Sequence, residues 1–248
     1  MLRVMTASPL LLLSADSVDL ISAIRENDLV GLICLIGLTC MSIYSLMLII
    51  QKYLEVKVAK RQSRAFQGLV DEDGSWEALF VASKRYPDSP LAKLLKETYV
   101  ECRMENWFTG KKALGLENRL EIAKDTIASI LNRTMSREES RLQEKLTILA
   151  TISTIAPFIV LFGTVWGVLA SFQAIGREGS AALSALAPGI STALMTTIFG
   201  LIAATPALIA YNYFTREVTK ISGDMECFSN DIENAVRKQI LVDEEKVK

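Results

Sequence analysis

The chain has 248 residues, half of them hydrophobic, and its 27 basic and 28 acidic side chains leave a formal net charge of −1. This even mixture of signs excludes a strongly basic nucleic-acid surface, so nucleic acid is not expected as a partner. The chain has no histidine, and its four cysteines lack zinc-ligand or redox spacing. A His-based catalytic triad is thereby excluded, and no metal site or other cofactor is expected.

The first long apolar run begins near residue 29. Residues 1–28 are predicted to form a short external segment rather than a cleaved signal peptide, because the leucine run at 10–13 is short for a signal core. Residues 29–50 have the length of about 20 apolar residues that a helix needs to cross a bilayer. Further spans are predicted at 146–175 and 190–214. The expected fold is an all-α membrane protein with three transmembrane helices.

Residues 51–145 form a section too long to be a simple loop, so a cytoplasmic helical domain is predicted there. Turns are expected at Asp73-Gly74-Ser75 and at the prolines of YPDSP, residues 86–90. After Gly115, apolar residues recur with helical spacing up to the second span. One long helix is therefore predicted to run without a break into that span. The apolar face consists of Leu116, Leu120, Ile127, Leu131, Leu142 and Leu146.

Basic residues gather at one end of each predicted span. By the positive-inside rule, this places the N-terminus outside, the loop at 176–189 also outside, and the C-terminal segment 215–248 in the cytoplasm. The residues concerned are Lys52, Lys57, Lys60, Arg61, Arg64, Arg137, Arg141, Lys145, Arg216 and Lys220.

The C-terminal segment 215–248 carries an apolar stripe with alternating spacings of three and four residues. Such a stripe predicts a helix that continues from the third span and packs against a neighbouring helix. Charged residues on the other faces are interpreted as solvated surface. The stripe is formed by Val218, Ile221, Met225, Phe228 and Ile232.

Two stretches carry no Asp, Glu, Lys or Arg at all: the one between Lys145 and Arg177, and the one between Glu178 and Arg216. Both contain many Gly, Pro, Ser and Thr residues, whereas a plain membrane anchor is rich in Leu and Val. Small and hydroxyl side chains let helices approach closely or face water. The second and third spans are therefore predicted to form a structure together, with their cytoplasmic ends extended into the cytoplasmic domain.

In the second span, Pro157, Thr164 and Ser171 are spaced by seven residues and fall on nearly one helix face. Pro157 removes a backbone hydrogen bond and is predicted to kink the helix. Gly163 and Gly167 form a small-x-x-x-small pair, which favours close packing against another helix.

The third span repeats these features. Thr196 lies beside a face of small, weakly polar residues. Pro188 and Gly189 are expected to start the helix or to end the external loop, and Pro206 is predicted to kink the helix near the cytoplasm. The small face consists of Ala193, Thr197, Gly200 and Ala204.

Two interpretations of Thr164, Thr196 and Thr197 are open. Each hydroxyl can bond a carbonyl of its own helix one turn back, as membrane Ser and Thr commonly do. Alternatively, the hydroxyls line a hydrated interior, because both spans combine them with proline. Threonine orients water but holds no charge, and these spans contain no carboxylate, Lys or His. If the protein moves protons, another chain must supply the ionisable residue.

At these residues the chain resembles the MotA/TolQ/ExbB proton-channel family. The three-span layout fits the TolQ and ExbB branch better than the four-span MotA branch. The short external N-terminus and the match at AYN, residues 210–212, favour the TolQ side over the ExbB side. The matching motifs are Ala156-Pro157, LFGTVWG at 161–167, APGISTAL at 187–194, Thr197, Gly200-Leu201, Ala203-Ala204, Pro206-Ala207 and Tyr211-Asn212.

The resemblance implies a homo-oligomeric, pentameric ring in the bacterial inner membrane, with a periplasmic N-terminus. Its second and third spans would line a pore around the helices of an ExbD- or TolR-like single-span partner, whose Asp carries the proton. A TolA- or TonB-like protein would transmit the work to the outer membrane. The family's pore threonines match Thr164 and Thr197.

Two positions depart from relatives of this family. Thr192 stands where relatives with the motif PGIAEAL have an acidic residue, and Thr196 stands where they have Ala. With Ser171, both are included among the predicted pore-lining residues.

A structural scaffold that recruits partners without conducting ions is the alternative function. An enzyme is not expected, because no nucleophile–base pair or phosphate loop is present.

Overall fold

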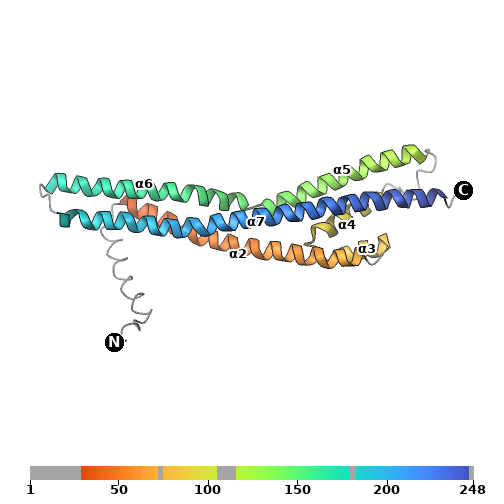
Figure 1. Ribbon diagram of the computed structural model, residues 1–248, viewed down its shortest axis with the longest axis horizontal. Coiled ribbons are helices and arrows are strands. Elements are labelled where there is room, and N and C mark those ends of the chain that lie inside the picture. The colour runs from red at the N-terminus through yellow and green to blue at the C-terminus, as the bar shows by residue number, and fades with distance from the viewer. Residues whose placement is uncertain (1–28, 72–74, 105–115, 179–182, 246–248) are drawn as a thin grey trace, which may run out of the picture. The chain divides into compact units, whose positions relative to one another are not determined.

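The computed structural model describes residues 29–71, 75–104, 116–178 and 183–245, and the predictions for residues 1–28 lie outside these ranges. Every element in the described ranges is a helix, which confirms the all-α prediction (Figure 1). The helices are α2 (Leu29–Asp71), α3 (Trp76–Ser83), α4 (Pro90–Met104), α5 (Leu116–Gln143), α6 (Leu146–Glu178) and α7 (Leu183–Glu245).

Three segments are long and apolar enough to cross a membrane, as the sequence predicts. They lie within Val30–Val70, Glu121–Gln173 and Gly189–Val242. The chain divides into two compact units. Unit 1 contains the described residues within 29–49 and 148–210, and unit 2 contains those within 50–147 and 211–245.

The core of unit 1 lies where α2, α6 and α7 meet. Leu38 of α2, Ala156 and Val160 of α6, and Ala204 of α7 are buried against one another, with Ile159 packed beside them. Three of these side chains are no larger than Val, so the helix backbones approach closely.

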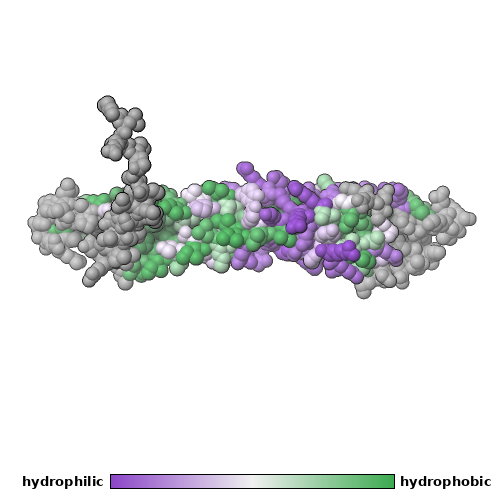
Figure 2. All heavy atoms as spheres, turned by 90° about the horizontal axis from the view of Figure 1, so that it is seen from below, coloured by the Kyte–Doolittle hydropathy of each residue, from purple (hydrophilic) through white to green (hydrophobic). Residues whose placement is uncertain are grey.

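Large apolar side chains of unit 1 point outward, and this face of the unit is predominantly hydrophobic (Figure 2). Such a surface is stable in lipid, whereas a water-exposed face would be polar. Exposed members include Ile33, Ile43, Phe158, Leu161, Phe162, Val165, Phe172, Ile198, Leu201 and Ile202.

The core of unit 2 is built on the apolar stripe of α7, whose predicted residues are all buried. Phe228 of this stripe packs edge-on against Phe66 of α2, whose ring also meets Tyr86. The predicted face of α5 is likewise buried at Ile127, Leu131 and Leu142, while the side chains of residues 116–120 lie outside the described part. The stripe also extends beyond the prediction, to Phe214, Val236 and Ile240.

Polar caps start the two short helices of unit 2. The Ser75 hydroxyl accepts from the backbone N–H of Ala78 and caps α3, whereas Asp73 and Gly74 of the predicted turn lie outside the described residues. The Ser89 hydroxyl accepts from the N–H of Ala92 at 3.2 Å and does the same for α4. The predicted break at YPDSP is therefore confirmed.

The prediction of one unbroken helix from Gly115 into the second span is wrong. Helix α5 ends at Gln143, helix α6 begins at Leu146, and Lys145 between them has a φ of 68°. Left-handed backbone usually falls on Gly or Asn, and it costs other residues about 1 kcal/mol. Because no Gly or Pro marks this position, the sequence pattern did not reveal the break.

The helix that contains the third span begins earlier than predicted. Pro188 and Gly189 were expected to start this helix or to end the external loop, but α7 begins at Leu183 and continues through both. Helix α6 similarly extends to Glu178, beyond its predicted end at residue 175. Both helices therefore continue into the segment 176–189 that was expected to be a loop.

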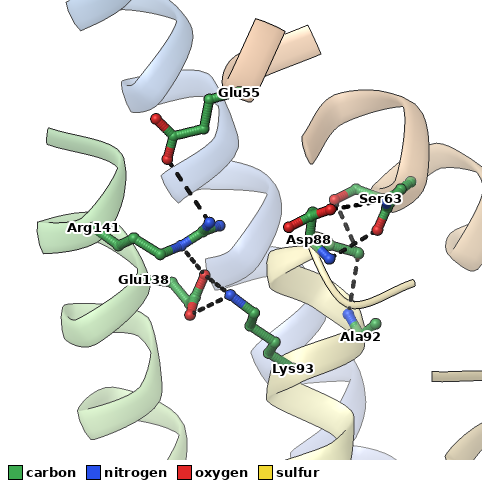
Figure 3. Close-up of polar contacts among 9 residues, drawn as sticks. Glu55, Ser63, Asp88, Ala92, Lys93, Glu138 and Arg141 are labelled. Atoms are coloured by element: carbon green, nitrogen blue, oxygen red, sulfur yellow. Dashed lines mark hydrogen bonds and ion pairs between the residues drawn. The ribbon is translucent and has the colours of Figure 1, made fainter. Parts of the chain in front are cut away.

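Some charged residues of unit 2 are buried, contrary to the interpretation of its charges as solvated surface. Lys52, Glu138 and Glu217 are less than a tenth exposed. Glu138 of α5 accepts two hydrogen bonds of 2.8 Å from Lys93 of α4 and one of 2.9 Å from Arg141 (Figure 3). Arg141 also faces Glu55 of α2 at 3.7 Å. This ion-pair group connects three helices.

Removal of the Glu138 carboxylate tests this connection. Glu138→Gln should lower the free energy of unfolding by about 1–3 kcal/mol, because Lys93 and Arg141 lose their shared partner. The measurement is the thermal unfolding of the full chain in detergent. Glu226→Gln, an exposed substitution on α7, is the matched control. Equal melting temperatures for the two variants would contradict the assigned role of Glu138.

Candidate functional site in the α6 and α7 pair

Helices α6 and α7 run antiparallel and make contact through a row of small residues (Figure 1). A Cβ atom on Gly200 would lie 1.7 Å from Cγ2 of Val160, and one on Gly167 would lie 3.1 Å from Cβ of Ala193. At position 200, any side chain would require Val160 or the helices to move. Gly200 thus leaves room for the Val160 side chain directly against the backbone of α7.

Gly163 lies where all three helices of unit 1 meet. A Cβ placed on it would be 3.5 Å from Cβ of Cys34 on α2 and 3.5 Å from Cγ2 of Thr196 on α7. These are ordinary van der Waals distances, so Gly163 has more room than Gly200. Sequence reasoning did not identify Cys34 as part of this contact, because its segment reads as a uniform apolar run.

Ser171 and Thr196 are buried between α6 and α7. Their side chains are 7% and 6% exposed. The Ser171 hydroxyl donates to the Gly167 carbonyl at 2.8 Å, and its oxygen would lie 2.0 Å from a Cβ on Gly189. Within one chain, both residues therefore contribute to the packing of α6 against α7.

Thr164 and Thr197 are more accessible than these two residues, since both are half-buried. The Thr164 hydroxyl donates to the Leu161 carbonyl at 2.8 Å, and the Thr197 hydroxyl donates to the Ala193 carbonyl at 3.4 Å. These are the bonds to the same helix that the first interpretation of the threonines predicts. A hydroxyl that donates in this way keeps oxygen lone pairs that can accept from water.

The remaining predicted site residues lie on the same two helices. Helix α6 continues through Pro157, and α7 continues through Pro206. Thr192 lies in α7, but its side chain is outside the described part of the chain. The described residues include no group of three or more Cys, Asp or Glu side chains that could hold a metal ion.

This arrangement defines a multi-pass helical membrane protein whose second and third spans pack through small residues and carry no charge between 146 and 176 or between 179 and 215. A model of the MotA/TolQ/ExbB proton channel family matches residues 92–227, which include α6 and most of α7. The chain belongs to this family.

The curated relatives of the chain include both TolQ and ExbB proteins. The chain is 28% identical to the Tol-Pal system protein TolQ of Pseudomonas aeruginosa, over 91% of the chain and 95% of the relative. It is 30% identical to TolQ of Haemophilus influenzae, over 87% and 92%. It is 34% identical to the biopolymer transport protein ExbB of Pseudomonas putida, over 78% of the chain but 56% of that relative.

A methyl group at Gly200 tests the close approach of α6 and α7. Gly200→Ala should lower the free energy of unfolding by about 1–3 kcal/mol, because the new Cβ overlaps Val160. Thermal unfolding in detergent measures the effect. Gly37→Ala is the control, since no heavy atom outside its own helix lies within 4 Å of a Cβ there.

A second substitution makes this test specific. Val160→Ala removes the methyl groups that collide with the new Cβ, so the double variant should recover part of the stability lost in Gly200→Ala. Strictly additive losses in the double variant would contradict the proposed overlap.

Proposed function

We propose that this chain is an inner-membrane subunit of a proton-motive-force-driven motor complex of the TolQ and ExbB type. Copies of the chain form a pentameric ring, with the N-terminus in the periplasm and the C-terminus in the cytoplasm. The ring surrounds the transmembrane helices of an ExbD- or TolR-like partner. A TolA- or TonB-like protein uses the resulting motion at the outer membrane.

The observation that carries this proposal is the absence of any charged residue from the apolar parts of α6 and α7 in a member of a proton channel family. A proton needs a titratable group or a chain of water molecules to cross the bilayer core. The partner's Asp supplies the titratable group. The chain itself supplies a surface on which that carboxylate can be hydrated.

Thr164 and Thr197 are the residues best suited to that surface. Both are half-buried, so a neighbouring helix or water can reach them, whereas Ser171 and Thr196 are covered by the α6 and α7 contact. Their hydroxyl oxygens can accept hydrogen bonds from water near the partner's carboxylate. Thr192, Ser171 and Thr196 remain secondary candidates for the pore lining.

Both TolQ and ExbB proteins are similar to the chain. The alignment covers 95% and 92% of the two TolQ sequences, but 56% of ExbB of Pseudomonas putida. This supports a TolQ-like role, in which the complex maintains the outer membrane. An ExbB-like role in transport differs in the cargo and not in the use of the proton gradient.

A structural scaffold is the second candidate function. It is favoured by the hydrogen bonds of Thr164 and Thr197 to their own helices, which give each hydroxyl a role without a pore. A scaffold needs the small-residue packing of α6 and α7 but no access of water to the threonines.

Replacement of the two threonines by valine separates these functions. Thr164→Val and Thr197→Val should each reduce proton flux through the complex with its partner by about tenfold, because one hydrogen-bond acceptor for water is lost. The measurement is proton flux in vesicles under an imposed gradient. Thr205→Val is the matched control, since the exposed Thr205 hydroxyl also donates to a carbonyl one turn back, that of Leu201.

Native mass spectrometry of the same preparations should show unchanged copy numbers of chain and partner in every variant. Undiminished flux in both pore variants would contradict the motor proposal. It would favour the scaffold, for which these threonines only satisfy their own helices.

A further inference from the structure

A cavity of about 430 Å³ lies in unit 2 between α2 and α7. Its cationic lining consists of Lys57, Lys60, Arg61 and Arg64, all on one face of α2. Glu217 is the carboxylate among the described lining residues, and it is already paired with Lys60 and with Lys220. The cavity therefore has an excess of positive charge.

Three of these cations have no anionic partner among the described residues. The ion pairs of the described part include neither Lys57, Arg61 nor Arg64. Lys57 instead lies 5.5 Å from the centre of the Tyr53 ring. An adjoining cavity of about 220 Å³ shares Lys60 and Arg64 and adds Lys220 and the carboxylate of Asp224, so the two cavities together keep an excess of cations. Cations that line one cavity repel one another, so an anion bound between these Lys and Arg side chains would be stabilised.

The same part of α2 also exposes apolar side chains. Ile50, Tyr53, Leu54 and Val58 are between 40% and 61% exposed, and Tyr213 of α7, which lines the cavity, is 50% exposed. The occupant of the site should therefore combine a negatively charged group with apolar chains. A free anion does not use such an apolar rim, and an acidic peptide does not require one.

The position of the cations along α2 fits a membrane lipid. Arg64 lies about 9 Å along the helix from Val58, the last of these exposed apolar residues. Residues 29–50 of α2 carry no charge, and the exposed apolar residues up to Val58 continue this apolar part. The cationic face of α2 therefore follows its apolar face along the helix, which is the order in which a helix leaving the bilayer meets acyl chains and headgroups.

We propose that Lys57, Lys60, Arg61 and Arg64 form a binding site for the headgroup of an anionic phospholipid. Basic pockets beside membrane helices on the cytoplasmic side are suited to such headgroups. Arginine can bind phosphate oxygens through two parallel hydrogen bonds, which gives the site geometric preference as well as charge. Tyr53 and Tyr213 supply the amphipathic rim on which the glycerol and upper acyl groups rest.

Native mass spectrometry of the full chain tests the site. Detergent-solubilised protein is mixed with equal amounts of phosphatidylglycerol and phosphatidylcholine, and the retained lipid is counted. Phosphatidylglycerol should be retained about fivefold more than phosphatidylcholine. Equal retention of the two lipids would overturn the proposal.

The double variant Arg61→Gln/Arg64→Gln should weaken retention of phosphatidylglycerol by about tenfold. Both side chains are exposed, so the variant should remain folded, which circular dichroism checks. Lys96→Gln/Lys238→Gln removes the same charge from exposed positions outside the cavity and should retain lipid normally. An equal loss in this control would show an effect of net charge and overturn the site.

Two further outcomes identify other occupants. If millimolar inorganic phosphate displaces the lipid, the site binds a soluble anion and the lipid assignment is wrong. If the arginine variant changes the number of chains in the complex but not the retained lipid, the surface contacts a second copy of the chain, and the proposal is again wrong. These readouts do not use proton flux, so they are independent of the motor proposal.

Discussion

The close approach of α6 and α7 is the constraint on which the rest of unit 1 depends. Inside a bilayer, apolar side chains gain little from leaving lipid for protein, so helices associate through close van der Waals contact between small residues. Gly200 against Val160 and Gly167 against Ala193 provide this contact. Large apolar residues are consequently left for the outer surface, where they meet lipid. The contact also decides which threonines are covered and which are accessible.

Unit 2 is held together by a different balance of forces. Its helices meet through a conventional apolar stripe on α7, and the ion-pair group around Glu138 connects α4, α5 and α2. Hydrophobic burial drives such packing in water, where it does not depend on small residues. Helices α2 and α7 each contribute residues to both units and so satisfy both kinds of packing along one chain segment.

Much of this fold could be predicted because it rests on periodicity. The α7 stripe at Val218, Ile221 and Met225 was visible in the spacing alone, and the apolar spans were visible in length and composition. The break at Lys145 was not, because a left-handed lysine leaves no mark in the sequence. Glu138 was misread since a charge normally indicates solvent, although it follows Leu131 and Thr134 and precedes Leu142 on the buried face of α5.

The candidate site could be predicted only in part, because spacing along a helix does not fix how the helix is rotated against its neighbour. Helical spacing placed Thr197 with Ala193 and Gly200, whereas the structure buries Thr196 with them and leaves Thr197 half-exposed. Neighbouring residues on a helix differ by about 100°, and the exact rotation of α7 depends on contacts such as Gly200 with Val160. Sequence spacing identifies a face but not which edge of that face a partner helix covers.

The hydrogen bonds of Thr164 and Thr197 have one more consequence for any group that contacts these two side chains. Because each hydroxyl hydrogen is already used by a backbone carbonyl, a water molecule beside it must donate to the threonine and cannot accept from it. A group that meets either threonine from outside its own helix therefore finds a hydrogen-bond acceptor. The two side chains favour hydrogen-bond donors over acceptors, although this part of the chain carries no charge.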